Sequence, residues 1–304
     1  MILLWGLEND PPLNAVRSAL DRLGQQYFFL DQRAVGRTEV EFEAGHRITG
    51  RVRCDGRDLQ LECVSACYLR PDDSRGIVAS GGEETRQALL EHALQADDAM
   101  LSWSEMTPAL VVNRPSAMGS NSSKPYQLEL IRQLGFLTPE TLATTDAEEL
   151  MNFWKQHGHI IYKSISGVRS IVSRFTAEQL CRLPNLATCP TQFQQYIPGV
   201  DYRVHVVGDA VFASEVRSSS DDYRYGPSEV LPCGVPEEIV GRSKALAEAL
   251  ALILAGVDLR RTPEGSWYCF EVNPSPGFTF YDRLQGHPIA TAVADLLSRM
   301  DDQV

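Results

Sequence analysis

The alternation of hydrophobic and polar residues along the chain predicts strands and helices in turn from its first residues. Apolar runs at 1–6 and 27–30 have the length and composition of strands. Between them, the span from Pro11 to Leu23 has the spacing of an amphipathic helix, and Gly24 closes it. This strand–helix–strand order predicts a Rossmann-type lobe. The lobe has no GxGxxG motif, so the sequence gives no support for a dinucleotide site there.

The same two patterns, alternation for strands and helical spacing for helices, predict the later elements. Together these elements divide the chain into three lobes. We expect strands at 38–43, 58–62, 64–69, 110–112, 159–163, 171–174, 192–197, 202–207 and 210–217. We expect helices at 83–103, 123–134, 147–156 and 236–254, and a last helix with Pro288 in its first turn. The fold class is therefore α/β with α+β lobes, and the predicted lobes are 1–106, 107–189 and 190–304.

Composition and charge narrow the class of protein. The chain has 304 residues, 43% of them hydrophobic, and no apolar run long enough to span a bilayer. Its net charge of -12 argues against a general nucleic-acid surface, so we expect neither nucleic acid nor a membrane as a partner. Seven scattered cysteines without a CxxC pair are typical of a reduced, cytoplasmic protein. No HExxH spacing occurs, which leaves zinc hydrolysis without support.

A hairpin near the C-terminal end has the chemistry of a metal site. Two apolar segments flank a turn rich in Pro and Gly, and Asp258 lies on the first while Glu271 and Asn273 lie on the second. Because side chains alternate along a strand, Glu271 and Asn273 share a face, and we expect Phe270 and Val272 on the other. Three oxygen-bearing side chains of this kind suit Mg²⁺ when phosphates complete its shell. The alternative is a solvated strand end with a chance acid.

Two lysines are candidates to bind phosphate. Lys124 begins a predicted helix after a small, polar segment. Lys163 ends an apolar strand and precedes a loop that contains Ser166, Gly167 and Arg169. Backbone N–H groups of such a loop, together with the lysine, can face a triphosphate. The chain has no GxxxxGK[ST], which excludes a P-loop enzyme. Each lysine alone could equally be a solvated surface charge.

A strand–turn–strand segment that follows has the groups that a purine nucleoside needs. Adenine requires a donor and an acceptor on a backbone edge, which the chain from Gln195 through Tyr196 to Ile197 can supply. Gln194 adds a side-chain amide, and Asp201 can accept the ribose hydroxyls. Segments of this form are common, so the prediction depends on its position between the lysines and the acidic hairpin.

In this order, the parts resemble the ATP-grasp superfamily, and most of all its RimK-like and graspetide (microviridin-type) ligase branch. The resemblance covers roughly residues 110–304. It also implies the ATP-grasp fold, with residues 1–106 as a Rossmann-like pre-ATP-grasp lobe. The matching segments are Lys124–Leu130, the strand ending at Lys163, Gln194–Ile197, Asp201–Asp209, Ala255–Asp258 and Glu271–Gly277.

The resemblance implies a role for each matching residue. ATP would lie between two lobes, with Lys124 and Lys163 on its phosphates. Asp201 would bind the ribose. Asp258, Glu271 and Asn273 would hold one or two Mg²⁺ ions, with Mn²⁺ as the alternative metal. The other residues that the resemblance assigns to the nucleotide are Ser166, Gly167, Arg169, Gln194, Gln195, Tyr196 and Ile197. Arg203, Arg217 and Arg224 would supply the remaining positive charge near the reacting groups, although each could instead form a structural ion pair.

The function that follows is an ATP- and Mg²⁺-dependent ligase that joins a carboxylate to an amine or a hydroxyl through an acylphosphate. Its substrate would be a peptide, an amino acid or a small carboxylic acid, and a homo-oligomer is consistent with the family. Two alternatives remain open: a small-molecule kinase of the same fold, and a non-catalytic nucleotide-binding subunit. The segment from Arg217 to Pro236 is shorter than graspetide ligases have, which argues against peptide macrocyclisation.

Overall fold

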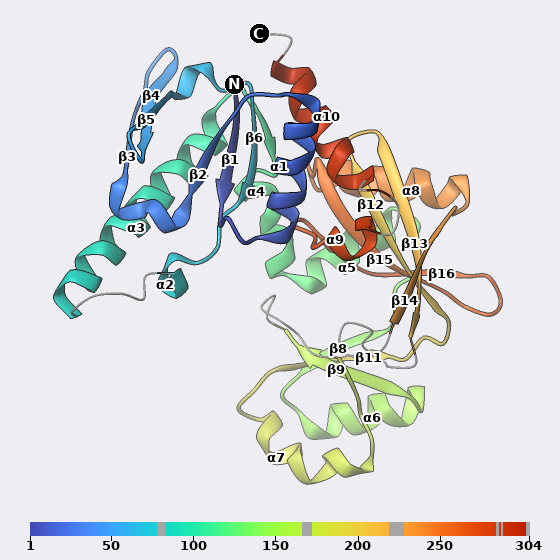
Figure 1. Cartoon of the computed structure of the whole chain (residues 1–304). Helices are drawn as coiled ribbons and strands as arrows, with labels where there is room; N and C mark the ends of the chain where they lie inside the picture. Colours follow the sequence, from blue (N-terminus) through green and yellow to red (C-terminus); the bar gives the residue numbers. More distant parts are fainter. Residues whose placement is uncertain (78–82, 166–171, 219–227, 284–285, 287, 302–304) are drawn as a thin grey trace. The chain divides into compact units, whose positions relative to one another are not determined.

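The chain folds into two compact units (Figure 1). The structure is a computed structural model that describes residues 1–77, 83–165, 172–218, 228–283, 286 and 288–301. The first unit comprises residues 1–118, 251–254 and 275–304, and the second comprises residues 119–250 and 255–274. The division into three lobes stays a prediction.

A four-stranded parallel sheet organises the first unit. Its strand order is β2-β1-β6-β7. The strands are β1 (Ile2–Gly6), β2 (Tyr27–Asp31), β6 (Ala66–Arg70) and β7 (Leu110–Val112). The helices are α1 (Pro11–Leu23), α2 (Ser74–Ile77), α3 (Glu83–Met106), α4 (Pro115–Met118), α9 (Thr279–Asp282) and α10 (Pro288–Asp301), and the 3₁₀ segments are η1 (Gln32–Arg37) and η2 (Leu61–Cys63). The predicted opening strand, helix and second strand are confirmed.

Helices cover both faces of this sheet, because its central strands are apolar on both sides. Alternate residues of β1, Leu3 and Trp5, pack with Met100 and Trp103 of α3 in one core. On the opposite face, α1 lies beside α10 (Figure 1). Local signals fix α1: Asp10 accepts a hydrogen bond from the Leu13 N–H at 2.8 Å, and the helix ends at Gly24 in the left-handed conformation.

A small antiparallel sheet adds to the first unit, and one of its strands was not predicted from the sequence. Its order is β3-β4-β5, with β3 at Thr38–Ala44, β4 at Ile48–Cys54 and β5 at Arg57–Gln60. β4 has a short apolar face, because Val52 and Cys54 are buried in the core, but Arg51 and Arg53 alternate with them on the other face. These arginines form exposed cross-strand ion pairs with Glu41 at 2.7 Å and Glu39 at 3.1 Å, so half of the strand is charged and its apolar pattern is short.

The second unit contains two sheets. The first has the order β10-β9-β11-β8. Its strands are β8 (Thr141–Thr144), β9 (Ile160–Ser164), β10 (Ser173–Arg174) and β11 (Thr191–Gln195). The accompanying helices are α5 (Lys124–Gln133), α6 (Ala147–His157) and α7 (Leu183–Leu186), with 3₁₀ segments η3 (Gly119–Ser122) and η4 (Ala177–Arg182). Phe193 of β11 packs with Leu150 of α6 and Leu186 of α7, so these helices cover one face and leave the other for the site.

The other sheet of this unit has the order β14-β13-β12-β15-β16. Its strands are β12 (Val200–Val207), β13 (Ala210–Ser218), β14 (Ser228–Cys233), β15 (Leu254–Arg261) and β16 (Trp267–Asn273). Helix α8 spans Glu237–Ala249, shorter than the predicted 236–254. The apolar stripe continues past its end, but Ala251 turns with φ 54°, and the Asn113 amide accepts from the Ile253 and Leu254 N–H groups. Hydrogen bonding to Asn113 therefore holds residues 253 and 254 outside the helix, although the hydrophobic periodicity alone predicts that the helix continues to them.

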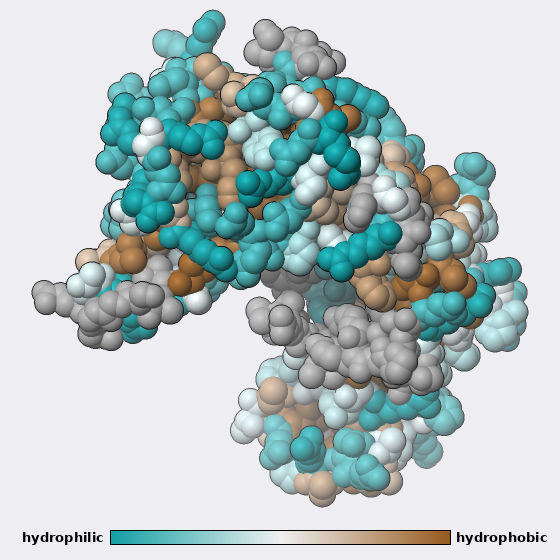
Figure 2. All heavy atoms as spheres, viewed as in Figure 1, coloured by the Kyte–Doolittle hydropathy of each residue, from teal (hydrophilic) through white to brown (hydrophobic). Residues whose placement is uncertain are grey.

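The surface is mainly hydrophilic on the face shown in Figure 2, with hydrophobic residues in smaller groups. No helix among the described residues has both the length and the apolar character that a transmembrane span requires.

Asp282 tests how the last helix is held in the first unit. Its carboxylate is fully buried and accepts hydrogen bonds from the Ile289 N–H at 2.7 Å and the Ala290 N–H at 3.3 Å. We expect Asp282→Ala to lower the free energy of unfolding by about 2 kcal/mol, because the first-turn N–H groups lose their acceptor. Urea titration followed by circular dichroism measures the change. Asp295→Ala, in the same helix, is the matched control, and equal stability of the two variants would contradict the capping role.

Candidate active site

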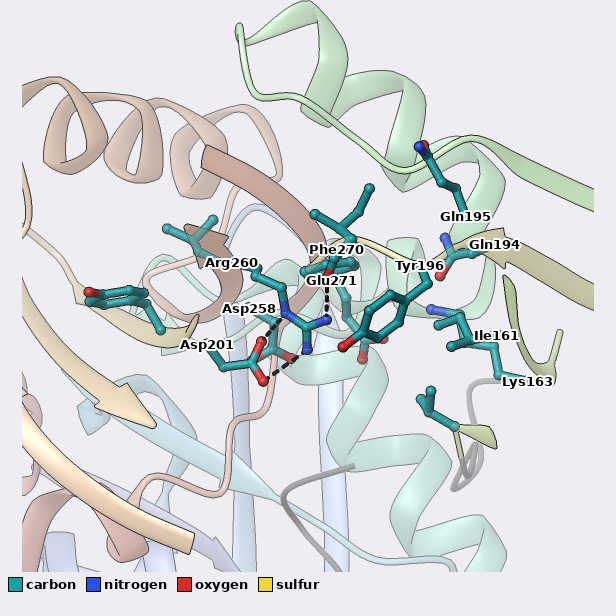
Figure 3. Close-up of a pocket in the computed structure, with 14 residues that line it drawn as sticks. Ile161, Lys163, Gln194, Gln195, Tyr196, Asp201, Asp258, Arg260, Phe270 and Glu271 are labelled. Atoms are coloured by element: carbon teal, nitrogen blue, oxygen red, sulfur yellow. Dashed lines mark hydrogen bonds and ion pairs between the residues drawn. The ribbon is translucent and has the colours of Figure 1, made fainter. Parts of the chain in front are cut away.

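A pocket within the second unit gathers eight of the residues predicted to bind nucleotide or metal (Figure 3). They come from β9, β11, β12, β15, β16 and the turn after β11. The eight are Lys163, Gln194, Gln195, Tyr196, Ile197, Asp201, Asp258 and Glu271. Arg260 and Phe270 are among the six other lining residues, none of which was predicted as a site residue.

The β9–β11 pair forms a polar wall of this pocket. Gln194 lies opposite Ile161 in the antiparallel register, so their side chains share the face away from Phe193. Gln194 is fully buried, and its Nε2 donates to Thr141 Oγ1 at 3.0 Å. Its Oε1 has no hydrogen-bond partner within the described residues. A buried acceptor without a partner costs about 1–3 kcal/mol, so this position favours a ligand that donates a hydrogen bond.

The backbone just beyond β11 offers the Ile197 N–H as a candidate donor. The N–H of Gln195 donates to the Glu140 carbonyl at 2.9 Å, and the N–H of Tyr196 donates to the His159 carbonyl at 2.9 Å. Both amides are therefore used within the sheet. No hydrogen bond between described residues uses the Ile197 N–H, so this group can serve a bound base.

Asp201 is held by an arginine from another strand. Arg260 Nε and Nη2 donate to the two Asp201 carboxylate oxygens at 2.7 and 2.9 Å, and Nη1 donates to the Ile197 carbonyl at 2.8 Å (Figure 3). The predicted ribose acid thus sits in a bidentate ion pair. Asp201 was predicted from its position after a Pro-Gly turn. Arg260 had no comparable signal, because one of two adjacent arginines on a strand looks like a surface charge.

The acidic end of the pocket depends on the pairing of β15 with β16. Asp258 lies directly opposite Glu271, and Asn273 lies opposite Gly256. The register then shifts, so that Leu259 pairs with Cys269 and Phe270 is an extra residue on β16. The prediction that Phe270 points away from Glu271 is wrong: the bulge places both side chains in the pocket. Asp258 and Glu271 are on one face, as predicted.

Two cations adjoin these acids. Arg203 Nη1 contacts Asp258 Oδ1, and Lys124 Nζ lies 3.5 Å from Glu271 Oε2. Arg203 Nε also donates to His205 Nε2 at 3.5 Å. Burial, and then the charge of Arg203, hold the pKa of His205 well below its usual range, so this imidazole is neutral and can accept.

The acids also influence each other. Burial raises the pKa of the Asp258 carboxyl, the negative charge of Glu271 raises it further, and the charge of Arg203 opposes the rise. A divalent cation would relieve this repulsion. Within the described ranges, no group of three or more His, Cys, Asp or Glu side chains is arranged to hold a metal. A cation here would have two carboxylates and the Asn273 amide, and would need further ligands from a bound molecule.

Gln127 fixes the edge strand that contributes Glu271 and Asn273. β16 is the last strand of its sheet, so one side of its backbone lacks a strand partner. The Gln127 side chain, buried on α5, donates to the Val272 carbonyl at 2.8 Å and accepts from the Val272 N–H at 2.8 Å. One amide side chain therefore replaces a neighbouring strand between the two predicted metal ligands. A glutamine inside a predicted helix gave no sequence signal for this role.

Not every predicted residue joins the site. Arg217 is 59% exposed and forms an ion pair with Glu215 at 2.6 Å. In the β12–β13 register, Glu215 pairs with Tyr202, so Arg217 lies on the face opposite to that of Arg203. The structure does not bring Arg217 and Arg203 together. Ser166, Gly167, Arg169 and Arg224 lie outside the described residues.

The turn between β11 and β12 passes very close to β15. Gly199 has φ 154°, and a Cβ at this position would lie 2.3 Å from the Arg261 carbonyl oxygen. Only glycine fits this approach without displacing backbone. The close contact places Ile197 and Asp201, on either side of the turn, beside Arg260.

Comparison with known proteins agrees with this geometry. The RimK-like ATP-grasp domain matches residues 122–297. A probable α-L-glutamate ligase of Pseudoalteromonas translucida is 28% identical over 210 residues, which cover 64% of this chain and 69% of the relative. Among solved structures, the macrocyclase MdnC of Microcystis aeruginosa, bound with precursor peptide MdnA, superposes with a TM-score of 0.83 at 23% identity, covering 97% of this chain and 98% of MdnC.

A second solved structure, the ATP-grasp ligase PsnB with a phosphomimetic variant of its minimal precursor, Mg and ADP, has a TM-score of 0.79 at 24% identity, covering 99% of this chain and 98% of PsnB. These structures show that the chain has the ATP-grasp fold, with a parallel N-terminal sheet and antiparallel sheets beyond it. The chain belongs to the RimK-like ATP-grasp family. It is an ATP-grasp ligase, as the resemblance in the sequence implied.

Removing the Gln127 amide should weaken the support of β16 and, with it, the positions of Glu271 and Asn273. We expect Gln127→Leu to leave both Val272 backbone groups buried without partners, at a cost of about 2–3 kcal/mol in the free energy of unfolding. Binding of Mg·ADP should weaken as well, because Glu271 and Asn273 lose their support. Calorimetric titration and chemical unfolding measure the two effects. Gln133→Leu, on an exposed position of the same helix, is the control. Unchanged ADP affinity in a folded Gln127→Leu protein would contradict the positioning role.

The close approach at Gly199 gives an independent test. We expect Gly199→Ala to force the turn away from β15, with a loss of about 1–3 kcal/mol in stability and weaker ADP binding. The matched variant Gly234→Ala places a methyl group where no atom lies within 4 Å, and should leave both quantities unchanged. Thermal unfolding with and without ADP separates the two variants. Equal melting curves for both would show that the turn does not need glycine.

Proposed function

We propose that this ligase uses ATP and Mg²⁺ to join a carboxylate of a peptide substrate to an amine or a hydroxyl group. A carboxylate oxygen attacks the γ-phosphorus of ATP, the bond to the β–γ bridging oxygen breaks, and ADP leaves. The amine or hydroxyl then attacks the acyl carbon of the acylphosphate, loses its proton, and displaces inorganic phosphate. The product is an amide or an ester, and the substrate loses one water.

The wall at β9 and β11 supports the assignment of ATP to this pocket. The orphan Gln194 Oε1 can accept from the exocyclic amine of adenine, and the Ile197 N–H can donate to a ring nitrogen. Asp201 has oxygens for the ribose hydroxyls. Lys163, with 6% of its surface exposed, lies two residues along β9 from Ile161 on the same face, so its charge is directed to the phosphate side.

The acidic end supports Mg²⁺ as the metal. Asp258, Glu271 and Asn273 provide hard oxygen ligands on one strand pair, too few for a closed protein site and suitable for a metal that phosphates also bind. Bound there, Mg²⁺ would neutralise charge on the β- and γ-phosphates. Arg203 and Lys124, each paired with one of the acids, are placed to hold these carboxylates and to add positive charge beside the transferring phosphoryl group.

Two sets of relatives bear on the substrate. The solved structures that match nearly the whole chain include enzymes bound with precursor peptides, whereas the curated relative above is a probable glutamate ligase. Because MdnC superposes on nearly the whole chain with a TM-score of 0.83, against 0.61 for a D-alanine–D-alanine ligase that covers 99% of it, we favour a peptide over a free amino acid. The short segment after Arg217, which argued against macrocyclisation, lies partly outside the described residues.

One observation carries this proposal most. Asp258 and Glu271 face each other across β15 and β16 at one end of the pocket, and at its other end Gln194 Oε1 has no hydrogen-bond partner among the described residues. The test of the proposal is a mass-spectrometric assay with Mg·ATP and peptides that carry Asp or Glu next to Lys, Ser or Thr. A peptide that loses one water while ADP is released, and that forms a hydroxamate in hydroxylamine, supports the ligase. A stable phosphoester product would instead show a kinase.

Glu271→Gln should lower ATP turnover at least about 100-fold, because a neutral amide cannot neutralise a metal as a carboxylate does. Release of ADP in the peptide assay measures the rate, and excess EDTA should abolish it in the wild-type protein. Glu129→Gln, on the exposed side of α5, is the matched control and should retain wild-type turnover. Full activity of Glu271→Gln would exclude Glu271 as a metal ligand.

A further inference from the structure

The guanidinium of Arg260 connects three parts of the pocket that are distant in sequence. It forms the bidentate pair with Asp201 at the start of β12 and donates to the Ile197 carbonyl in the turn after β11. Its own strand, β15, carries Asp258 two residues earlier on the same face. Arg260 therefore contacts the predicted base edge and the predicted ribose acid from the strand that also carries Asp258.

Aromatic rings hold this guanidinium in place. Its Cζ lies 5.2 Å from the ring centre of Phe270, which the β16 bulge turns into the pocket, and 5.9 Å from that of Tyr196. The Tyr196 ring is itself covered by Arg174 at 4.6 Å. Cation–π contacts of this kind restrict the guanidinium to one plane. The Arg260 side chain is 15% exposed and that of Asp201 is 20% exposed, so the pair is ordered yet remains open to a ligand.

The bidentate pair with the Arg260 guanidinium fixes the orientation of the Asp201 carboxylate. Each carboxylate oxygen accepts one N–H from Arg260, and a carboxylate has about four acceptor positions in total. Both oxygens thus keep acceptor capacity in a fixed direction, side by side, which matches the two neighbouring hydroxyls of a ribose. The positive charge of Arg260 also offsets the charge of Asp201, which would otherwise repel a polyphosphate. A deoxyribose would leave one of these oriented acceptors without a donor.

We infer that Arg260 is the specificity-determining residue of the nucleotide site: it orients Asp201 so that the ligase selects ribonucleotides over 2′-deoxyribonucleotides. This inference rests on the proposed ATP function of the pocket. It assigns Arg260 a positioning role, because the guanidinium acts on the nucleotide through Asp201.

Calorimetric titration of the full chain with ADP and with 2′-deoxy-ADP, both with Mg²⁺, tests this role. We expect the wild-type protein to bind ADP about tenfold or more tightly than 2′-deoxy-ADP, which corresponds to one hydrogen bond to a charged group. Arg260→Met should reduce this ratio to less than about threefold. Arg260→Lys keeps the charge and loses the fork, so it should also reduce the ratio while folding as the wild type does. Arg261→Met, on the opposite face of β15, is the control and should keep the ratio.

The ratio of the affinity for ADP to that for 2′-deoxy-ADP separates a positioning role of Arg260 from a merely structural one. If Arg260 only stabilised the pocket, Arg260→Met and Arg260→Lys would lower the affinities for ADP and 2′-deoxy-ADP equally. An unchanged ratio of the two affinities would therefore overturn the inference. In an Asp201→Asn background, Arg260→Met should change the ratio no further, because the two residues act as one unit. Equal wild-type affinity for the two ligands would overturn the role of Arg260 while the ligase proposal stands. No Mg·ADP binding by the wild type would overturn the proposed function and this inference with it.

Discussion

The pairing of β15 with β16 is the constraint on which the candidate site depends. Their register sets Asp258 opposite Glu271, and the bulge just beyond it turns Phe270 toward the same pocket. A slip of one residue would move every one of these side chains to the other face. Since β16 is the edge of its sheet, this register needs support from outside the sheet. The Gln127 amide provides it by pairing with both backbone groups of Val272.

Charge balance is the second requirement of this site. Asp258 lies opposite Glu271, and burial first, with the negative charge of Glu271 added to it, raises the pKa of the Asp258 carboxyl. Arg203 and Lys124 offset the negative charge of these acids, and each is itself nearly buried, so neither could be accommodated without its acid. The neutral His205 behind Arg203 accepts a hydrogen bond without adding charge. In this cluster the two acids lie side by side and each is paired with one cation, so a metal and phosphates could join it between the acids.

Residues whose chemistry stands out in the sequence were found in advance, and residues that act through geometry were not. The hairpin pattern predicted that Asp258 meets Glu271 from the neighbouring strand, and helical spacing closed by Gly24 predicted α1. The direction of Phe270 toward the pocket was not predicted, because a bulge depends on how two strands pair and not on the sequence of one strand. The roles of Gln127 and Arg260 depend on partners 145 and 59 residues away. The strand β4 was missed because Arg51 and Arg53 alternate with its two buried residues, Val52 and Cys54, which leaves only a short apolar pattern.

In the candidate site, the acids of β15 and β16 would bind a metal together with a nucleotide held along β11. Anomalous diffraction from crystals grown with Mn²⁺ and ADP would test it most directly, since Mn²⁺ prefers the same oxygen ligands as Mg²⁺. We expect an anomalous peak bounded by Asp258, Glu271 and Asn273, with the ADP phosphates beside it and the adenine amine at Gln194 Oε1. A bound ADP whose metal contacts neither Asp258 nor Glu271 would contradict it.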